Sequence, residues 1–132
     1  MKAHLKAELR KLRVSIVYLF GSRAIGRTSR LSDVDIGIVL KKSPYEEDTR
    51  ALYHSLYEIF TGIYPASKLD IVLLQTAPLS LQYSAIKDGK IIYEEDSKST
   101  ADYENRVINQ YLDFRPVLDL FDRVTMKRYA KA

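Results

Sequence analysis

The sequence predicts a mixed α/β (α+β) domain, in which a small β-sheet is flanked by helices. Short apolar runs rich in β-branched residues alternate along the chain with segments whose apolar residues recur every three or four positions. Gly, Pro and polar residues separate these segments. The length of 132 residues suits one domain over residues 1–132, because compact domains usually contain about 100–200 residues.

Helix and strand alternate in the first third of the chain. Residues 2–13 predict an amphipathic helix, because three leucines share one of its faces: Leu5, Leu9 and Leu12. Val14–Phe20 is almost continuously apolar, which is typical of a strand buried on both faces. Residues 23–31 combine Gly, Thr and Ser with three arginines and predict a short helical turn and a loop. A second strand is expected at residues 33–40.

The middle of the chain repeats this alternation. Residues 46–61 predict a helix that Gly62 ends. Its apolar stripe contains four residues: Leu52, Leu56, Ile59 and Ile63. Residues 69–74 predict the third strand, and residues 78–88 predict a short helix closed by Gly89.

The last third of the chain is expected to be mainly helical. Residues 90–93 predict a short fourth strand, and residues 94–100 predict a polar connector. The helical pattern that begins at residue 101 has a long apolar stripe: Tyr103, Val107, Tyr111, Phe114, Leu118 and Phe121. Such a stripe normally docks on a core or on a partner helix. Pro116 is expected to kink or break this helix one or two residues before the proline.

The basic excess of the chain lies near its N-terminus. The formal net charge is +4 and the pI is near 9.2, which by itself suggests a nucleic-acid binder. Residues 1–30, however, contain eight basic residues and one acid, whereas residues 31–132 contain thirteen basic and sixteen acidic residues. We therefore expect a small anionic ligand near the N-terminal segment, rather than a nucleic acid as the main partner.

The composition also excludes several kinds of site. The chain contains no cysteine, which excludes disulfides, thiolate zinc sites and a thiol nucleophile. No apolar run approaches the roughly 18 residues of a membrane span, and no apolar signal core follows the first residues. We therefore expect a cytoplasmic protein without a membrane partner.

Three aspartates suggest a site for a divalent cation. Alternate side chains of a strand share a face, so Asp33 and Asp35 point together while Val34 and Ile36 enter the core. Two adjacent carboxylates repel each other unless a cation such as Mg²⁺ or Mn²⁺ lies between them. Asp70 interrupts the third predicted strand and joins the pair if that strand neighbours the second. The alternative is that such aspartates are turn or cap residues, or face water.

A Gly-Ser pair suggests a site for a phosphate. Gly21 and Ser22 follow a buried strand and precede a predicted helical turn, a geometry that presents backbone N–H groups to an anion. Alone, such a pair more often only turns the chain. Here ten residues separate Ser22 from Asp33, and this spacing predicts that an anion cradle and a cation site lie at neighbouring strand ends.

These motifs resemble the signature of a known superfamily. The runs Leu-Phe-Gly-Ser-Arg-Ala at residues 19–24 and Ser-Asp-Val-Asp-Ile at residues 32–36 resemble those of DNA polymerase β nucleotidyltransferases, most closely the minimal nucleotidyltransferases. Asp70 stands where that family has its third carboxylate. Ile25 departs from the pattern, because relatives often have arginine there. The segment at residues 111–114, before Pro116, is similar to antitoxins of the MntA type, which belong to HEPN/MNT toxin–antitoxin pairs.

The resemblance implies a nucleotidyltransferase fold and a two-metal transfer of AMP from ATP. Asp33 and Asp35 would bridge two Mg²⁺ or Mn²⁺ ions, and Asp70 would complete the site that activates the acceptor hydroxyl. Gly21 and Ser22 would hold the β- and γ-phosphates, and Arg23 matches a nucleotide-binding position.

The resemblance also implies an acceptor and a partner. The acceptor would be a tyrosine of a HEPN ribonuclease toxin, with which the chain would form a hetero-oligomer. Two other functions stay open at this point. One is nucleotidyl transfer to a small molecule or an RNA end, which the lack of a second domain disfavours. The other is a binding antitoxin that sequesters its partner without chemistry, which three carboxylates at one site disfavour.

Overall fold

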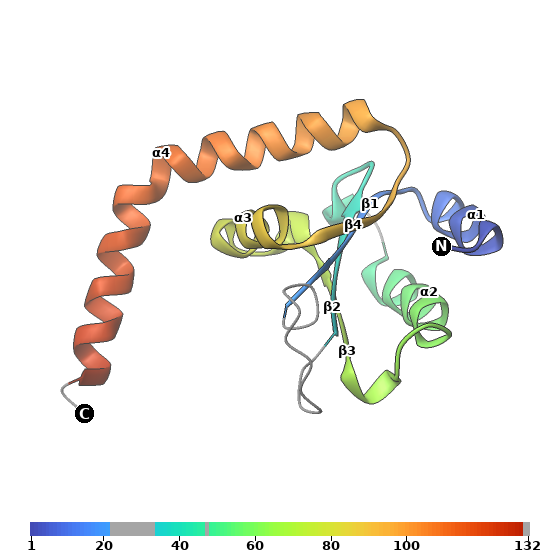
Figure 1. Ribbon diagram of the computed structural model, residues 1–132, viewed down its shortest axis with the longest axis horizontal. Helices are drawn as coiled ribbons and strands as arrows, with labels where there is room; N and C mark the ends of the chain where they lie inside the picture. Colours follow the sequence, from blue (N-terminus) through green and yellow to red (C-terminus); the bar gives the residue numbers. More distant parts are fainter. Residues whose placement is uncertain (22–33, 47, 131–132) are drawn as a thin grey trace.

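The fold is built on a four-stranded mixed sheet (Figure 1). A computed structural model describes residues 1–21, 34–46 and 48–130. The strands are β1 (Val14–Phe20), β2 (Val34–Leu40), β3 (Leu69–Leu73) and β4 (Lys90–Glu94), in the spatial order β3-β2-β1-β4. Strand β1 is antiparallel to β2 and β4, whereas β2 and β3 are parallel. The predicted mixed α/β class is confirmed.

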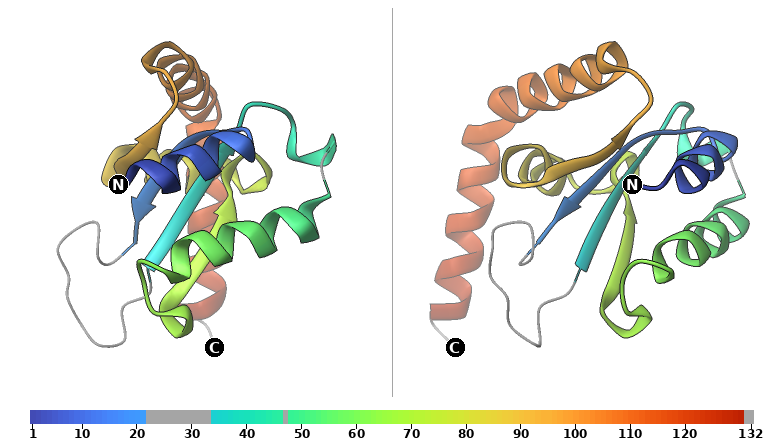
Figure 2. Two further views of the ribbon diagram at one scale, coloured as in Figure 1. Left: turned by 90° about the vertical axis from the view of Figure 1, so that its right-hand side faces the viewer. Right: turned by 45° about the vertical axis from the view of Figure 1, so that its right-hand side comes forward.

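Two helices lie on each face of the sheet (Figure 2). The helices α1 (Ala3–Lys11) and α2 (Thr49–Thr61) cover one face, and α3 (Leu79–Asp88) and the start of α4 (Ser97–Ala130) cover the other. Because β1 contributes to both cores, nearly all of its side chains are buried, as its apolar sequence predicts. Three short 3₁₀ turns complete the described elements: Pro44–Glu46, Ala66–Lys68 and Leu74–Thr76.

Leu56 anchors the core between α2 and the sheet. Its side chain is fully buried. Replacing Leu56 with alanine should lower the free energy of unfolding by about 2–5 kcal/mol, because a cavity adds to the loss of buried surface. The matched control, Leu120→Ala, removes an exposed leucine and should change stability by less than about 0.5 kcal/mol. Denaturant unfolding measures both values, and equal effects would contradict this packing.

Helix α2 begins three residues later than the sequence predicts and ends where it predicts. It begins at Thr49, because the carboxylate of Asp48 caps it by accepting the N–H of Arg50 at 3.1 Å. It ends at Thr61 with Gly62 as its cap. Ile63 lies beyond that end and is 43% exposed, so its assignment to the buried stripe was wrong. Phe60, which the prediction omitted, is fully buried instead.

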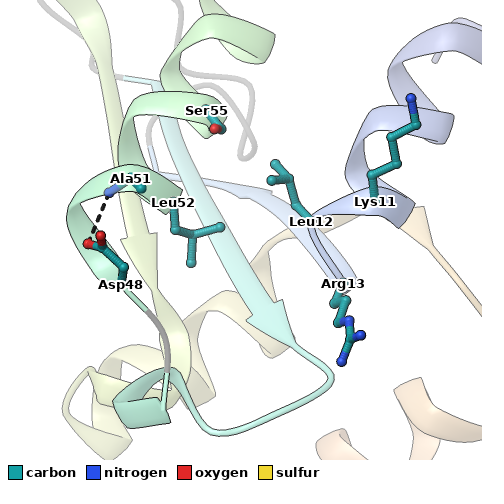
Figure 3. A pocket seen from close by; sticks show the side chains of 7 residues that line it. All are labelled: Lys11, Leu12, Arg13, Asp48, Ala51, Leu52 and Ser55. Carbon is teal, nitrogen blue, oxygen red and sulfur yellow. Dashed lines mark hydrogen bonds between the residues drawn. The ribbon is translucent and has the colours of Figure 1, made fainter.

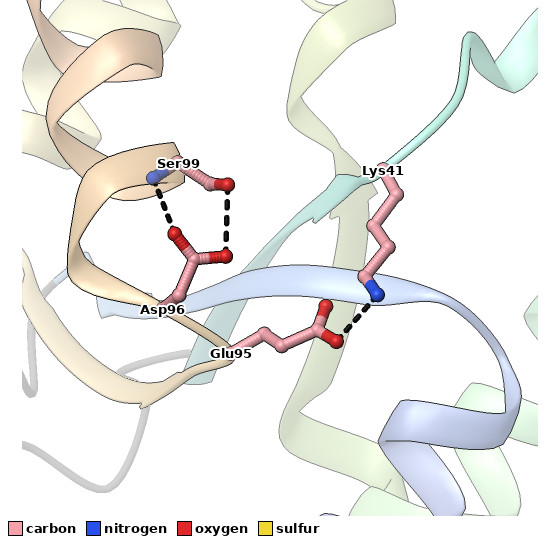
Figure 4. A network of polar contacts seen from close by, with 4 residues as sticks. All are labelled: Lys41, Glu95, Asp96 and Ser99. Carbon is pink, nitrogen blue, oxygen red and sulfur yellow. Dashed lines mark hydrogen bonds and ion pairs between the residues drawn. The ribbon is translucent and has the colours of Figure 1, made fainter.

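Helix α4 begins at Ser97, so the predicted polar connector at residues 94–100 is wrong for its second half. Asp96 explains the early start (Figure 4). Its carboxylate accepts the backbone N–H of Ser99 at 2.7 Å and the hydroxyl of the same residue at 2.9 Å. These two bonds hold the pKa of Asp96 below its usual value. Beside this cap, Lys41 forms an ion pair with Glu95.

Helix α4 does not end at Pro116, which lies inside it. Figure 1 shows that the helix bends partway along its length, as a proline within a helix favours. Beyond the bend, the helix leaves the sheet (Figures 1 and 2). Tyr103 and Val107 are buried as expected, whereas Phe114 is 56% exposed and does not pack on the core of this chain. The side chains of the last two stripe members lie outside the described part of the chain: Leu118 and Phe121. No helix in the described ranges is long and apolar enough to cross a membrane.

Candidate nucleotidyl-transfer site

The candidate site lies at the sheet edge where β1 ends and where β2 and β3 begin. In the antiparallel pairing, Phe20 is opposite Asp35, and in the parallel pairing Asp35 is opposite Asp70. Neighbouring strands lie about 4.8 Å apart, so Gly21, Asp35 and Asp70 stand in a row along this edge. The third strand does neighbour the second, which is the condition under which Asp70 can join the pair.

Asp35 and Asp70 share the sheet face that α3 and α4 cover. Val34 and Ile36, on either side of Asp35, are fully buried in the opposite core, whereas Asp35 itself is half-buried. Asp70 is exposed between Leu69 and Ile71, which are both buried. The strand alternation therefore directs both carboxylates away from the α1/α2 core, as the sequence pattern predicts. Three other predicted site residues lie outside the described residues: Ser22, Arg23 and Asp33.

Gly21 allows the carboxylate of Asp35 to lie against the end of β1. Its backbone has φ +82°, in the left-handed region that favours glycine. A Cβ atom at this position would lie 2.1 Å from Oδ2 of Asp35, far inside van der Waals contact. The sequence suggested that glycine lets a phosphate approach the backbone. The structure adds a second requirement, because glycine also makes room for the carboxylate of Asp35.

The donor set of the site suits a hard cation. Asp35 and Asp70 provide carboxylate oxygens, the ligands that Mg²⁺ and Mn²⁺ prefer. Within residues 1–21, 34–46 and 48–130, no three His, Cys, Asp or Glu side chains form a metal-binding cluster. The remaining predicted ligand, Asp33, directly precedes β2 in the sequence but falls outside those ranges.

Helix α3 contributes residues that the sequence analysis did not assign to the site. A pocket of about 260 Å³ adjoins the candidate site, and it is lined by Phe20, Gly21, Asp35, Leu81, Ser84 and Asp88. The last three belong to α3 and follow one another at spacings of three and four residues, which places them on one helix face. That spacing was readable in the sequence, but it became meaningful only once α3 was known to face Asp35.

A larger basic pocket lies at the opposite end of the sheet (Figure 3). It has a volume of about 380 Å³ and is lined by Lys11, Leu12, Arg13, Asp48, Ala51, Leu52 and Ser55. Arg13 directly precedes Val14, which pairs with Leu40, whereas the candidate site adjoins the other end of both strands. The positive charges of Lys11 and Arg13 are therefore not placed beside Gly21.

Buried tyrosines tie α3 and α4 to the sheet. Tyr18 on β1 donates its hydroxyl hydrogen bond to Glu104 at 3.1 Å, and Tyr103 donates to Gln82 at 2.8 Å. Burial raises the pKa of Tyr18 well above its ordinary value, and the charge of Glu104 adds to this effect. Burial also raises the pKa of Tyr103. Both hydroxyls therefore stay protonated and act as hydrogen-bond donors that hold these elements together.

The chain is similar to known nucleotidyltransferases. Residues 3–98 match the family described as polymerase beta, nucleotidyltransferase. The chain is 27% identical to the protein adenylyltransferase MntA of Aphanizomenon flos-aquae (strain 2012/KM1/D3), over 77% of each chain.

Solved structures share the fold. One is a toxin–antitoxin complex with AMP-PNP, in which the matching chain has a TM-score of 0.68 and 21% identity, covering 91% of this chain and 98% of its own length. Another is a tri-AMPylated Shewanella oneidensis HEPN toxin in complex with MNT antitoxin, with a TM-score of 0.63, 19% identity and coverage of 95% and 99%. With the family match over most of its length, this chain belongs to the polymerase beta nucleotidyltransferase family.

Proposed function

We propose that this protein is an antitoxin that transfers AMP from ATP onto a tyrosine of a HEPN ribonuclease toxin and so neutralises that toxin. The observation that carries the proposal is the row formed by Gly21, Asp35 and Asp70 in a nucleotidyltransferase fold. The relatives support the acceptor, because one is a protein adenylyltransferase and another was solved with an AMPylated HEPN toxin.

The residues of the site divide the work of the transfer. Asp33, Asp35 and Asp70 would hold two Mg²⁺ or Mn²⁺ ions, which when bound supply positive charge for the triphosphate and activate the acceptor hydroxyl. Gly21 would let the β- and γ-phosphates approach the backbone, together with Ser22 and, as a further nucleotide contact, Arg23.

The transfer itself exchanges one phosphorus–oxygen bond for another. The tyrosine oxygen bonds to the α-phosphorus, the bond from that phosphorus to the bridging oxygen breaks, and pyrophosphate leaves. The phenolic proton passes to water, which can reach this edge because Asp70 is exposed. The chain holds the two reactants in line, and this positioning replaces a bimolecular encounter.

The distal arm, defined as residues 112–120 of α4, would dock the toxin. Four of its apolar side chains are 49–60% exposed: Leu112, Phe114, Val117 and Leu120. At 3.6 residues per turn they span roughly 200° of the helix circumference, more than a helix needs to lie on a flat surface. The family match ends at residue 98, so this arm lies beyond the catalytic core. A groove of the partner that encloses the helix fits this distribution.

Replacing Phe114 with aspartate should weaken the complex with the toxin at least about tenfold, because buried aromatic residues dominate the affinity of such interfaces. Calorimetry on the purified pair measures the change. Asn109→Asp, which adds the same charge at an exposed polar position of α4, is the control and should bind like the wild type. If both variants bind equally well, the toxin docks elsewhere.

Transfer of labelled ATP tests the function as a whole. The protein, Mg²⁺ and the HEPN protein encoded beside its gene are incubated with ATP labelled on either the α- or the γ-phosphate. We expect α-label on a tyrosine of the partner, located by mass spectrometry, together with loss of its ribonuclease activity. Label from the γ-phosphate would indicate a kinase, and label on RNA would indicate a different acceptor. Neutralisation without ATP would leave only a binding antitoxin.

A further inference from the structure

Helix α3 adds an apolar side chain, a hydroxyl and a carboxylate to one side of the candidate site. Leu81, Ser84 and Asp88 form one face of α3 and line the pocket that also contains Gly21 and Asp35. The pocket thus extends from Gly21 and Asp35 of the candidate site to a hydroxyl and a carboxylate on α3. In the part of the chain that the structure describes, the side chains of Ser84 and Asp88 form no hydrogen bond or ion pair with another residue, and both are exposed.

Asp88 occupies a position that is unfavourable for a carboxylate. It is the last residue of α3, where the helix dipole presents partial negative charge. Gly89 follows Asp88 and allows the end of α3 to approach β1 closely. A Cβ atom at residue 89 would lie 2.3 Å from the carbonyl oxygen of Ala85 and 3.2 Å from Cβ of Phe20. The end of α3 is therefore held against the end of β1. This packing keeps an acid beside the site although local electrostatics disfavour it.

The lining of the pocket selects the part of a nucleotide that fits. Two carboxylates, from Asp35 and Asp88, disfavour a phosphate without a cation at the α3 side. Phe20 and Leu81 offer apolar surface, whereas the exposed side chains of Ser84 and Asp88 offer a hydroxyl and a carboxylate for hydrogen bonding. The volume of about 260 Å³ is below the range of about 300–1,000 Å³ that is typical of whole-ligand pockets, so it suits one moiety of a ligand.

We infer that this pocket binds the ribose of the nucleotide, an inference that rests on the proposed function. Asp88 accepts hydrogen bonds from the 2′- and 3′-hydroxyls, and Ser84 contributes its hydroxyl to the same sugar. Leu81 packs against the C–H surface of the ring. A carboxylate accepts hydrogen bonds but cannot donate them, which makes it a suitable partner for a pair of hydroxyl donors. The pocket therefore makes the enzyme prefer ribonucleotides over deoxyribonucleotides.

Nucleotide binding to the full chain tests the inference apart from transfer. Calorimetry with Mg²⁺ compares ATP with 2′,3′-dideoxyATP for the wild type, Asp88→Ala and Ser84→Ala. The wild type should bind ATP about tenfold or more tightly than the dideoxy analogue, the effect of one hydrogen bond to a charged group. Asp88→Ala should remove most of this preference, because it should weaken the binding of ATP but not that of the dideoxy analogue. Ser84→Ala should reduce the preference partly. Asp102→Asn, an exposed acid on α4 at the other end of the sheet, should retain it.

The outcomes separate this inference from the proposed function. The ribose site would be overturned if Asp88→Ala weakened the binding of both nucleotides equally, or did not weaken the binding of either. Loss of Mn²⁺ binding in the same variant would overturn it as well, because Asp88 would then be a metal ligand. If the ribose preference is found but no AMP reaches the partner protein, the proposed acceptor fails while the ribose site stands.

Discussion

Replacing Asp35 with asparagine should lower AMP transfer about a thousandfold or more, because cations at a phosphoryl group supply several kcal/mol of transition-state stabilisation. Asp35 lies between Gly21 and Asp70 in the row at the sheet edge, so its carboxylate is the one positioned to be shared by two ions. Asparagine keeps the shape but not the charge. Single-turnover transfer from α-labelled ATP to the HEPN partner measures the loss.

The control for this substitution must separate chemistry from folding. Asp102→Asn makes the same change at an exposed position of α4 and should transfer AMP at the wild-type rate. Thermal unfolding of Asp35→Asn should be cooperative and should occur near the wild-type temperature, because Asp35 is only half-buried. Retention of more than about a tenth of the activity would contradict a metal-binding role, since that loss equals only about 1.4 kcal/mol of barrier.

Gly21→Ala should damage both stability and transfer. The left-handed backbone costs an alanine about 1–2 kcal/mol, and its Cβ would lie 2.1 Å from the Asp35 carboxylate. The carboxylate must move, so transfer should fall by about a hundredfold or more, the cost of a displacement of about 1 Å at a reacting centre. Denaturant unfolding and the same label-transfer reaction measure the two effects.

A double-mutant cycle identifies the cause of the Gly21→Ala defect. In an Asp35→Ala background the steric conflict is removed, so Gly21→Ala should destabilise the protein less than it does in the wild type. Gly62→Ala is the matched control, because Gly62 has ordinary right-handed φ and its added Cβ would make only van der Waals contact, at 3.4 Å. That variant should be neutral or slightly stabilised. Strictly additive losses would mean that backbone strain, not the carboxylate, is responsible.

The sequence predicted the sheet and the row of acids because both depend on period-two patterning. Successive side chains of a strand point to opposite faces, so the alternation of residue types shows which face is buried. Asp35 and Asp70 interrupt runs that are otherwise apolar. The pairing of Asp35 with Asp70 also required that β2 and β3 be parallel neighbours in this register. The family resemblance, now confirmed by the match over residues 3–98, rests on the runs at residues 19–24 and 32–36 and on Asp70.

What the sequence could not predict depends on contacts between distant elements. The role of Ser84 and Asp88 depends on how α3 lies across the end of β1, which Gly89 decides. The exposure of Phe114 depends on the path of α4, whose distal part leads away from the sheet. The early start of α4 was readable in principle, because aspartate at residue 96 is a favoured helix cap.

The length of α4 has a consequence for how a target tyrosine is chosen. A helix of 34 residues is about 50 Å long, and its bend fixes where the distal arm points relative to the sheet edge. A toxin gripped by that arm would present its tyrosines at a restricted reach and at a high effective concentration. Position along the partner's surface, rather than the sequence around a tyrosine, would then decide which residue is modified. The length and bend of α4 would thus set the distance from the docking surface at which a tyrosine can be modified.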